Sequence, residues 1–241
     1  MDAQELLRRY DAGERDFTGV NLRHINLSGA DLTDANFTEA DLTGADLTGA
    51  VLIETNFNGA ELTGAKMKDA LFCRTIMPYG SIKSDPNRVI TTERLLERYA
   101  VGERDFPGII MPRADLRNRD LRGISMFHPQ SGNYPAYRPH LHNSNLRGAN
   151  LQGSFLRGAN FRGSDLSGVN LSDAILTAAN FTDVNLRGAN LLRADLEGVN
   201  FTRADLTGAE ILECSLWWLT FFHNTILPDG EIIVGPIHNS D

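Results

Sequence analysis

The chain has 241 residues and a formal net charge of −8, with 22 glycines and only 9 prolines. This composition excludes a collagen-like chain, and no run of about 18 apolar residues suggests a membrane span. The charged, amphipathic N-terminus lacks the apolar stretch of a secretory signal. With only two cysteines, Cys73 and Cys214, the composition suits a reducing compartment. We therefore expect a cytoplasmic protein that does not associate with a membrane.

The first predicted element is a short helix that occurs twice in the chain. Residues 5–17 read ELLRRYDAGERDF and residues 94–106 read RLLERYAVGERDF, with nine of thirteen positions identical. The leucines and the tyrosine of each copy share one helical face, and a glycine follows where a helix C-terminus favours it. We expect N-terminal capping helices at about 2–12 and 91–101, because a repeat stack must cover the ends of its core. The expected N-caps are Asp2 and Thr91 or Thr92.

A large apolar residue then recurs at every fifth position from Phe17 to Met77, with a small residue two positions before most of them, as in ADLTGADLTGA at 40–50. On a helix, five steps rotate by about 140°, and on a strand an odd spacing alternates faces. The spacing instead predicts a short extended piece whose small and central apolar residues both point inward. A corner follows at Thr-Gly, Arg-Gly or Ser-Gly. Repetition of this unit gives a coil whose rungs stack about 4.8 Å apart.

The phenylalanines indicate how many units make one coil. A second series of fifth-position apolar residues runs from Leu146 to Phe221. In both series the phenylalanines are spaced by twenty residues, which predicts four units per coil and one column of stacked rings. The expected columns contain Phe17, Phe37 and Phe57, and Phe161, Phe181, Phe201 and Phe221.

The repeated unit resembles a known family. Units of the form A-(D/N)-(L/F)-(S/T/R)-G stand at 30–34, 40–44, 45–49, 159–163 and 204–208. They are similar to pentapeptide-repeat proteins of the cyanobacterial type, with two tandem repeat blocks that each carry an N-terminal capping helix. The resemblance implies an all-β fold, a right-handed quadrilateral β-helix solenoid. The handedness comes from the family alone.

We expect two tandem solenoids, at 1–85 and 86–241, because the sequence also repeats an ending. TIMPYGSI at 75–82 and TILPDGEI at 225–232 each place Pro and Gly after the last apolar position. The segment 127–141, FHPQSGNYPAYRPHL, breaks the repeat. Phe106 and Phe161 are 55 residues apart, and removal of fifteen leaves two coils of twenty. The spacing therefore predicts a fifteen-residue loop, after which the coil resumes on the same face.

The sequence offers little support for catalysis. It contains no P-loop, GxGxxG or HExxH motif. The repeated Asp and Asn residues precede the inward Leu and are expected to form outward ladders. The pair His140 and His142, with His128 nearby, could contribute to a metal site, although ordinary packing or solvent-facing histidines are the favoured interpretation. Cys214 occupies an inward position and is expected to be a buried thiol. We predict no enzyme, no catalytic residues, no cofactor and no metal.

An arginine-rich belt provides the first candidate for binding. Residues 106–162 carry eight arginines and two acidic residues, whereas the segments before and after have net charges of −6 and −8. Outward positions could simply tolerate arginine. Alternatively, an acidic protein partner binds beside the loop, where aromatic and Arg side chains serve as anchors. Arg119 would point inward in a regular unit, so we expect distortion there. The candidate partner-binding residues are Arg117, Arg122, Tyr134, Tyr137, Arg138, Arg147, Arg157 and Arg162.

The apolar segment WWLTFF at 217–222 provides the second candidate. It is expected to cover the last coil or to form a homodimer face. The resemblance allows the second interpretation, because gyrase-protecting members of the family pair through their C-terminal ends. The candidate residues are Trp217, Trp218, Phe221 and Phe222.

The sequence therefore predicts a non-enzymatic scaffold or adaptor that presents flat β-helix faces and a projecting loop to a protein partner. The resemblance implies one alternative, a DNA mimic that binds a topoisomerase such as gyrase. The basic belt and the shortness of each solenoid count against mimicry. Direct nucleic-acid binding through the belt is disfavoured, because the acidic ends would repel phosphate.

Overall fold

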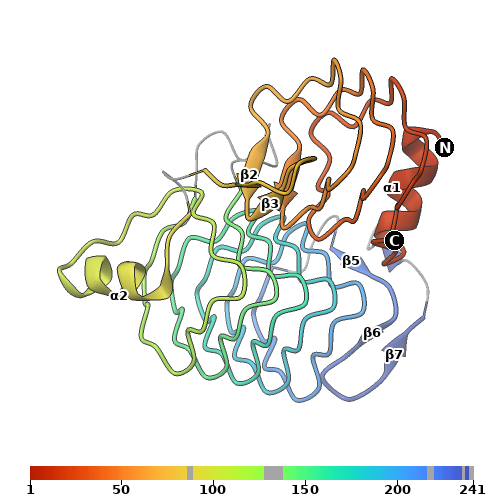
Figure 1. The fold of residues 1–241 in the computed structure, drawn as a ribbon. Coiled ribbons are helices and arrows are strands. Elements are labelled where there is room, and N and C mark those ends of the chain that lie inside the picture. Colours follow the sequence, from red (N-terminus) through yellow and green to blue (C-terminus); the bar gives the residue numbers. More distant parts are fainter. Residues whose placement is uncertain (86–88, 128–137, 216–219, 235–236, 239–241) are drawn as a thin grey trace. The chain divides into compact units, whose positions relative to one another are not determined.

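The computed structural model describes residues 1–85, 89–127, 138–215, 220–234 and 237–238 (Figure 1). These residues divide into two compact units. Unit 1 contains the described residues up to Val89, and unit 2 contains those from Ile90 onward. Each unit has its own apolar core.

Each unit begins with a two-turn helix. Helix α1 (Ala3–Asp11) follows Asp2, whose carboxylate accepts a hydrogen bond of 2.8 Å from the Glu5 N–H. Helix α2 (Thr92–Ala100) follows Thr91, whose hydroxyl accepts one of 3.2 Å from the Arg94 N–H. Such bonds satisfy amides that the first turn leaves unpaired. One leucine of each helix, Leu6 or Leu95, is fully buried in the core of its own unit.

The rest of each unit is a coil whose turns pair in parallel. In unit 2, Asn160 bridges to Asn180 and Asp165 to Asn185, and most other bridges also join residues twenty apart. Phe181 N–H donates to the Asn200 carbonyl at 2.8 Å, so each coil bonds to the next through its backbone. One coil therefore takes four pentapeptides. In unit 1 the rungs of two coils lengthen into a parallel strand pair, β1 (Val51–Ile53) and β2 (Leu71–Cys73).

The unit at 180–184 shows why the pentapeptide folds in this way. The Asn180 side chain accepts a hydrogen bond from the Thr182 N–H at 3.0 Å, and the Val184 N–H donates to the Phe181 carbonyl at 3.2 Å. Between them Asp183 has φ of 60°, the left-handed conformation that the third residue of a type II turn requires. Gly fills this corner in ADLTG units because it adopts positive φ without steric cost.

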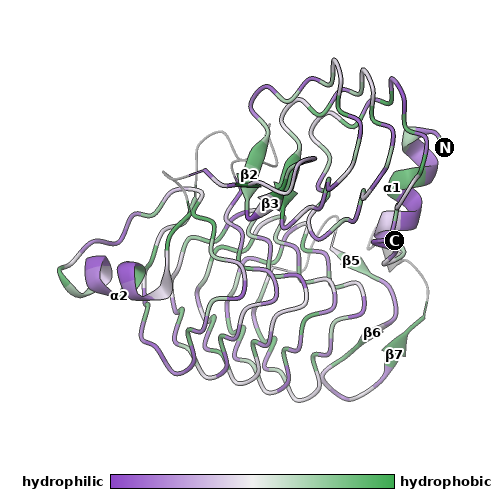
Figure 2. Ribbon diagram, viewed as in Figure 1, coloured by the Kyte–Doolittle hydropathy of each residue, from purple (hydrophilic) through white to green (hydrophobic). Residues whose placement is uncertain are grey.

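Two columns of phenylalanine rings run through the cores. In unit 2, Phe181 stacks on Phe161 and Phe201 with centroid distances of 5.3 and 5.5 Å. In unit 1 the three expected rings, Phe17, Phe37 and Phe57, stack at 5.5 and 5.6 Å. Along the coils, hydrophobic positions are interspersed with hydrophilic ones, as the hydropathy colouring shows (Figure 2). The twenty-residue spacing thus identified most of both columns.

The last ring of the unit 2 column was predicted wrongly. Phe222, not Phe221, stacks on Phe201, at 5.5 Å. The bridges explain the difference, because Asn200 pairs with Phe221, twenty-one residues later, whereas Asp195 pairs with Ser215, twenty residues later. The final coil therefore contains one extra residue, which moves the inward position from 221 to 222.

The interruption in unit 2 is also shorter than predicted. Asp105 bridges to Ser125, but Asp115 bridges to Asn145, thirty residues later, so the interruption adds ten residues and not fifteen. His140 bridges to Ile110 and already belongs to the coil, which makes the expected loop 127–141 too long at its C-terminal end. The prediction failed because it placed Phe106 in the Phe161 column.

Phe106 belongs instead to a neighbouring column. The pairing of Asp105 with Ser125, and of Ser125 with Phe155, aligns Phe106 with Met126 and then Leu156. The 55 residues from Phe106 to Phe161 therefore comprise ten inserted residues and nine pentapeptides. The coil does resume in register, but Phe161 lies one face further round than Phe106.

Both units end in an antiparallel hairpin. In unit 1, β3 (Thr75–Ile76) pairs with β4 (Ile82–Lys83); in unit 2, β6 (Thr225–Ile226) pairs with β7 (Ile232–Ile233). A second antiparallel pair in unit 2 joins β5 (Phe221–Phe222) and β8 (Ile237–His238). The reversal of direction ends the parallel stacking. Within the described parts of the chain, no helix combines the length and apolar character that a membrane crossing requires.

Candidate interaction surface

The arginines of the belt are distributed around the coil of unit 2. Asp115 bridges to Asn145, so Arg117 and Arg147, each two residues further on, occupy equivalent corners of consecutive coils. Three other candidate arginines follow different bridge columns. These are Arg122 after the Asp120 column, Arg157 after the Phe155 column and Arg162 after the Asn160 column. Arg117 and Arg147 therefore share a face.

Two belt arginines form ion pairs within their own pentapeptides. Arg117 donates to Asp115 through Nε at 2.9 Å and Nη2 at 2.7 Å. Arg122 makes the same paired contact with Asp120, at 2.9 and 2.8 Å. These hydrogen bonds raise the pKa of each guanidinium and lower the pKa of each carboxyl. The sequence analysis did not predict either ion pair. The tripeptide Asp-Leu-Arg at 115–117 and 120–122, which places an acidic and a basic residue two positions apart, could have indicated both.

Other arginines on the same coils make no such direct contact, although the charge of Arg119 helps to lower the pKa of Asp115. Within the described ranges, the structure shows no hydrogen bond or ion pair from the side chains of Arg119, Arg147 or Arg157. The expected distortion at Arg119 does not occur in its backbone hydrogen bonds. Its N–H donates to the Leu116 carbonyl at 3.2 Å, and its carbonyl accepts from the Asn150 N–H at 2.9 Å. Its side chain is nevertheless exposed, unlike the small inward residues of later coils.

Arg119 lines a polar hollow on the surface of unit 2. The hollow has a volume of about 270 Å³, and Asp115, Arg117, Asn118 and Arg119 line it. Asn118 was not among the predicted residues, because its corner position gave no chemical signal. A guanidinium fork binds carboxylate or phosphate oxygens in a planar, two-bond geometry. Since the hollow contains two arginines and one carboxylate, which Arg117 binds directly, it suits an anionic group.

The remaining belt candidates are less accessible or lie outside the described residues. Arg162 is largely buried, and its Nε lies 3.6 Å from Asp183 Oδ2. Arg138 is half-buried and its aliphatic stem passes close to Gly158, where an added Cβ would lie 3.4 Å from Arg138 Cγ. Tyr134 and Tyr137 lie outside the described residues.

The C-terminal candidates are described only in part. Trp217 and Trp218 lie outside the described residues, whereas Phe221 and Phe222 are half-buried in β5. Cys214 was expected to be buried but is half-exposed, and its thiol donates to the Ile211 carbonyl at 2.8 Å. The buried thiol is Cys73, whose burial raises its pKa to about 11.

The histidines considered as metal ligands belong to the coil. His140 and His142 flank the inward Leu141, and both are buried. His128 lies outside the described residues. The interpretation of His140 and His142 as packed coil residues fits this placement.

Acidic residues in the later coils of unit 2 are also paired. Arg193 donates to Asp173 through Nε at 2.7 Å and Nη2 at 3.0 Å, across adjacent coils. Arg203 contacts Asp183 in the same way, at 2.6 and 2.9 Å. Such pairs reduce the acidic field of this part of the surface.

Comparison with known proteins establishes the family. The model of pentapeptide repeats matches residues 16–52, 40–77, 140–177 and 179–217, in eight copies. These ranges cover more than half of the chain, so the protein belongs to the pentapeptide-repeat family. Membership of this family implies that the fold is a right-handed β-helix. A comparison with curated proteins gave no match.

Several solved structures are similar. HetL, a pentapeptide-repeat protein involved in heterocyst differentiation regulation from Nostoc sp. strain PCC 7120, is 26% identical, with 97% of this chain and 100% of that chain covered and a TM-score of 0.41. A pentapeptide-repeat protein from Cyanothece 51142 is 27% identical, with 55% and 96% covered and a TM-score of 0.34. QnrB1, a plasmid-mediated fluoroquinolone resistance protein, is 19% identical, with 82% and 84% covered and a TM-score of 0.28.

Proposed function

We propose that the protein is a non-enzymatic scaffold that binds an acidic segment of a protein partner through the early coils of unit 2. In this proposal each unit is a four-sided β-helix capped by its N-terminal helix, which holds the faces rigid. The binding surface consists of Arg117, Arg119 and Arg147, and we call it the arginine face. The carrying observation is that, among the described residues, the side chains of Arg119 and Arg147 form no hydrogen bond or ion pair, and that the one carboxylate near Arg119, Asp115, is already bound by Arg117.

The chemistry of the other outward positions supports this choice. Many Asn and Asp side chains accept a hydrogen bond from the backbone N–H two residues later, as Asn145 does from Arg147 at 3.2 Å. Their polarity therefore serves the turns of the coil. The free guanidinium groups serve no such role, and Arg is a residue type that interfaces favour.

DNA mimicry has less support from the same surface. A mimic needs a sustained negative field, but the ion pairs Asp173–Arg193 and Asp183–Arg203 interrupt the acidic ladders of unit 2. In a gyrase supercoiling assay we expect no inhibition or protection at micromolar protein. Inhibition that survives substitution of the arginine face would favour the mimic instead.

The scaffold proposal is tested with a labelled glutamate-rich peptide as the probe. Fluorescence anisotropy should show salt-sensitive binding to the intact chain, which Arg119→Gln with Arg147→Gln abolishes. The charge-matched control, Arg193→Gln with Arg203→Gln, removes two arginines that are already ion-paired and should leave binding unchanged. Equal loss in both double variants would show that net charge alone, and not the arginine face, governs binding.

Partner capture can also test the loop, provided that the deletion respects the coil. Deletion of ten residues, 128–137, restores the twenty-residue spacing between Ile110 and His140, whereas deletion of fifteen would move every later side chain by one face. If the protein with this deletion and the intact protein capture the same partners, the loop takes no part in recognition.

A further inference from the structure

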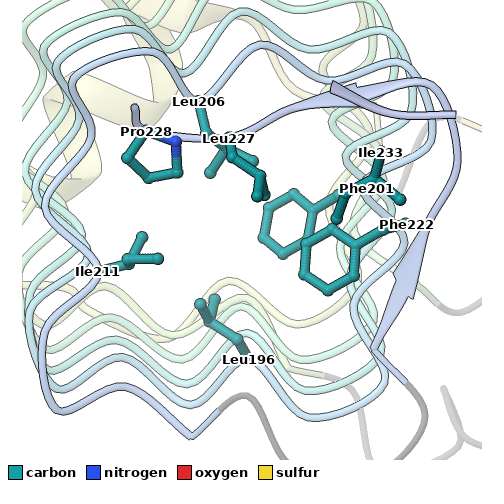
Figure 3. Close-up of a pocket in the computed structure, with 8 residues that line it drawn as sticks. All are labelled: Leu196, Phe201, Leu206, Ile211, Phe222, Leu227, Pro228 and Ile233. Atoms are coloured by element: carbon teal, nitrogen blue, oxygen red, sulfur yellow. The ribbon is translucent and has the colours of Figure 1, made fainter. Parts of the chain in front are cut away.

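Unit 2 contains an apolar pocket at its C-terminal end. The pocket has a volume of about 260 Å³ and eight lining residues, all apolar (Figure 3). The lining includes Ile211 from the last coil, Phe222 at the end of the ring column, and Leu227 and Ile233 from the terminal hairpin. Because none of the described residues places a polar side chain in its lining, the pocket offers a ligand no side-chain hydrogen bond there and disfavours a charged one.

The ring column of unit 2 ends at this pocket. Phe201 and Phe222 stack at 5.5 Å with an interplanar angle of 14°, and both rings line the cavity. Phe201 is fully buried, whereas Phe222 is only half-buried. Aromatic rings attract further rings in offset-stacked or edge-to-face arrangements. The end of the column therefore offers a surface that prefers an aromatic group.

The corresponding end of unit 1 shows what differs in unit 2. The terminal hairpins share their register, with Thr75 opposite Lys83 and Thr225 opposite Ile233. In unit 1 the Lys83 ammonium lies 3.6 Å from the centroid of the Phe72 ring. In unit 2 the position of Phe72 is taken by Phe222 and that of Lys83 by Ile233. A cation therefore occupies the ring face in unit 1, and an apolar side chain lies at the same place in unit 2.

We propose that this pocket binds a small neutral aromatic molecule, whose ring continues the phenylalanine column beyond Phe222. The size fits one or two fused rings, since an apolar cavity of about 150 Å³ lined by Leu, Ile and Phe already binds benzene. The arginine face takes no part in this site. The proposal is therefore independent of the scaffold function.

The test uses the full chain with labelled isoleucine methyl groups and indole as the probe. Titration should shift the Ile211 and Ile233 signals saturably, while those of Ile82 and Ile25, both in unit 1, stay unchanged. Ile233→Lys reproduces the unit 1 arrangement and should weaken binding by about tenfold or more, because a ligand would have to displace or bury the ammonium. Glu231→Gln makes a one-unit charge change on the same hairpin and should leave binding intact.

A second variant separates binding from folding. Ile211→Trp fills the cavity without adding charge and should also weaken indole binding, and the remaining methyl signals report whether the coil is intact. Naphthalene-1-sulfonate should bind more weakly than indole, because its anion would lose hydration. The proposal fails if indole shifts neither Ile211 nor Ile233, or if both variants bind like the parent chain. Concentration-dependent dimerisation that Ile233→Lys abolishes, in a chain whose Ile211 and Ile233 signals indole does not shift, would assign the pocket to a second copy instead.

Discussion

The guanidinium carbon of Arg15 lies 3.5 Å from the centroid of the Tyr10 ring, and one of its nitrogens donates to the Tyr10 carbonyl at 2.6 Å. In unit 2, Arg104 repeats both contacts with Tyr99, at 3.7 and 2.8 Å. The duplicated sequence RYxxGERDF therefore forms the same contacts after the C-terminus of each helix. In both copies the arginine satisfies a carbonyl near the helix C-terminus and stacks on the ring, which fixes the path into the first rung.

The two tyrosine hydroxyls differ in their environment, which permits a matched prediction. Tyr10 donates to the Thr33 carbonyl at 2.7 Å in a buried contact, whereas Tyr99 donates to the Arg122 carbonyl at 2.9 Å in an exposed one. Tyr10→Phe should lower the free energy of unfolding by about 1–3 kcal/mol, because it leaves a buried carbonyl unpaired. Tyr99→Phe should cost less than about 0.5 kcal/mol, since water replaces the hydroxyl. Urea unfolding measures both, and equal losses would contradict the assigned burial.

The pKa of Asp41 should be depressed to about 2. The main cause is the Thr43 hydroxyl, which donates to Asp41 at 2.6 Å; the Thr43 N–H and Arg23 contribute further. Carboxyl NMR titration should therefore show a larger upward shift in Thr43→Val than in Arg23→Gln. Because the folded pKa lies below the unfolded value of about 3.9, the stabilisation from ionised Asp41 is complete above that value and is lost as the pH falls towards 2. A larger effect of Arg23→Gln would show that the ion pair dominates.

Ring stacking in the unit 2 column should appear as a coupling energy. Phe181 and Phe201 are in direct contact at 5.5 Å, and both are fully buried. A double-mutant cycle with Phe181→Leu and Phe201→Leu should give a coupling of about 0.5–1.5 kcal/mol in unfolding free energy. The cycle with Phe161→Leu and Phe201→Leu is the control, because Phe181 separates those rings. Coupling of the same size in the control would point to a rearrangement of the whole column.

One corner residue is predicted to be suboptimal for stability. Ala178 has φ of 58°, between the equivalent corners Gly158 and Gly198 with φ of 69° and 66°. A left-handed conformation costs a residue with a Cβ about 1–2 kcal/mol, so Ala178→Gly should raise the free energy of unfolding by about 1 kcal/mol. The adjacent Ala179 is buried and points inward. Ala179→Gly should therefore lower stability by about 1 kcal/mol, and two substitutions with the same sign would contradict the corner geometry.

The coil itself could be predicted from the sequence because a period of five fits neither regular element. Asp165, Asn185 and Asp205 are equivalent positions on successive coils, and the bridges between them have the predicted spacing of twenty residues. Column membership was harder to predict. Inward positions accept Phe, Leu or Met, so residue type alone could not show that Phe106 aligns with Met126, or that an added residue places Phe222 in the column.

For the interaction surface, the sequence predicted only an arginine-rich segment and not which of its arginines lie on the same face. Arg117 and Arg122 are five residues apart, and the pentapeptide period already implies that they occupy different faces. Their Asp partners also follow from the two-residue spacing in Asp-Leu-Arg. The exposure of Arg119 could not be derived in this way, because the repeat pattern assigns its position to the inside of the coil. The apolar pocket required the hairpin geometry around Ile233, which no repeat pattern encodes.

The pairing of positions twenty residues apart has a consequence for how such a gene can change. A duplication of twenty codons adds one complete coil and leaves every later side chain on its original face. A duplication of five codons moves all later residues a quarter of the way round, which would carry Arg147 away from Arg117. If the residues of one face are under selection, the chain can therefore lengthen by whole coils or by insertions at a corner. Most insertions of other lengths would move those residues to another face and would be selected against.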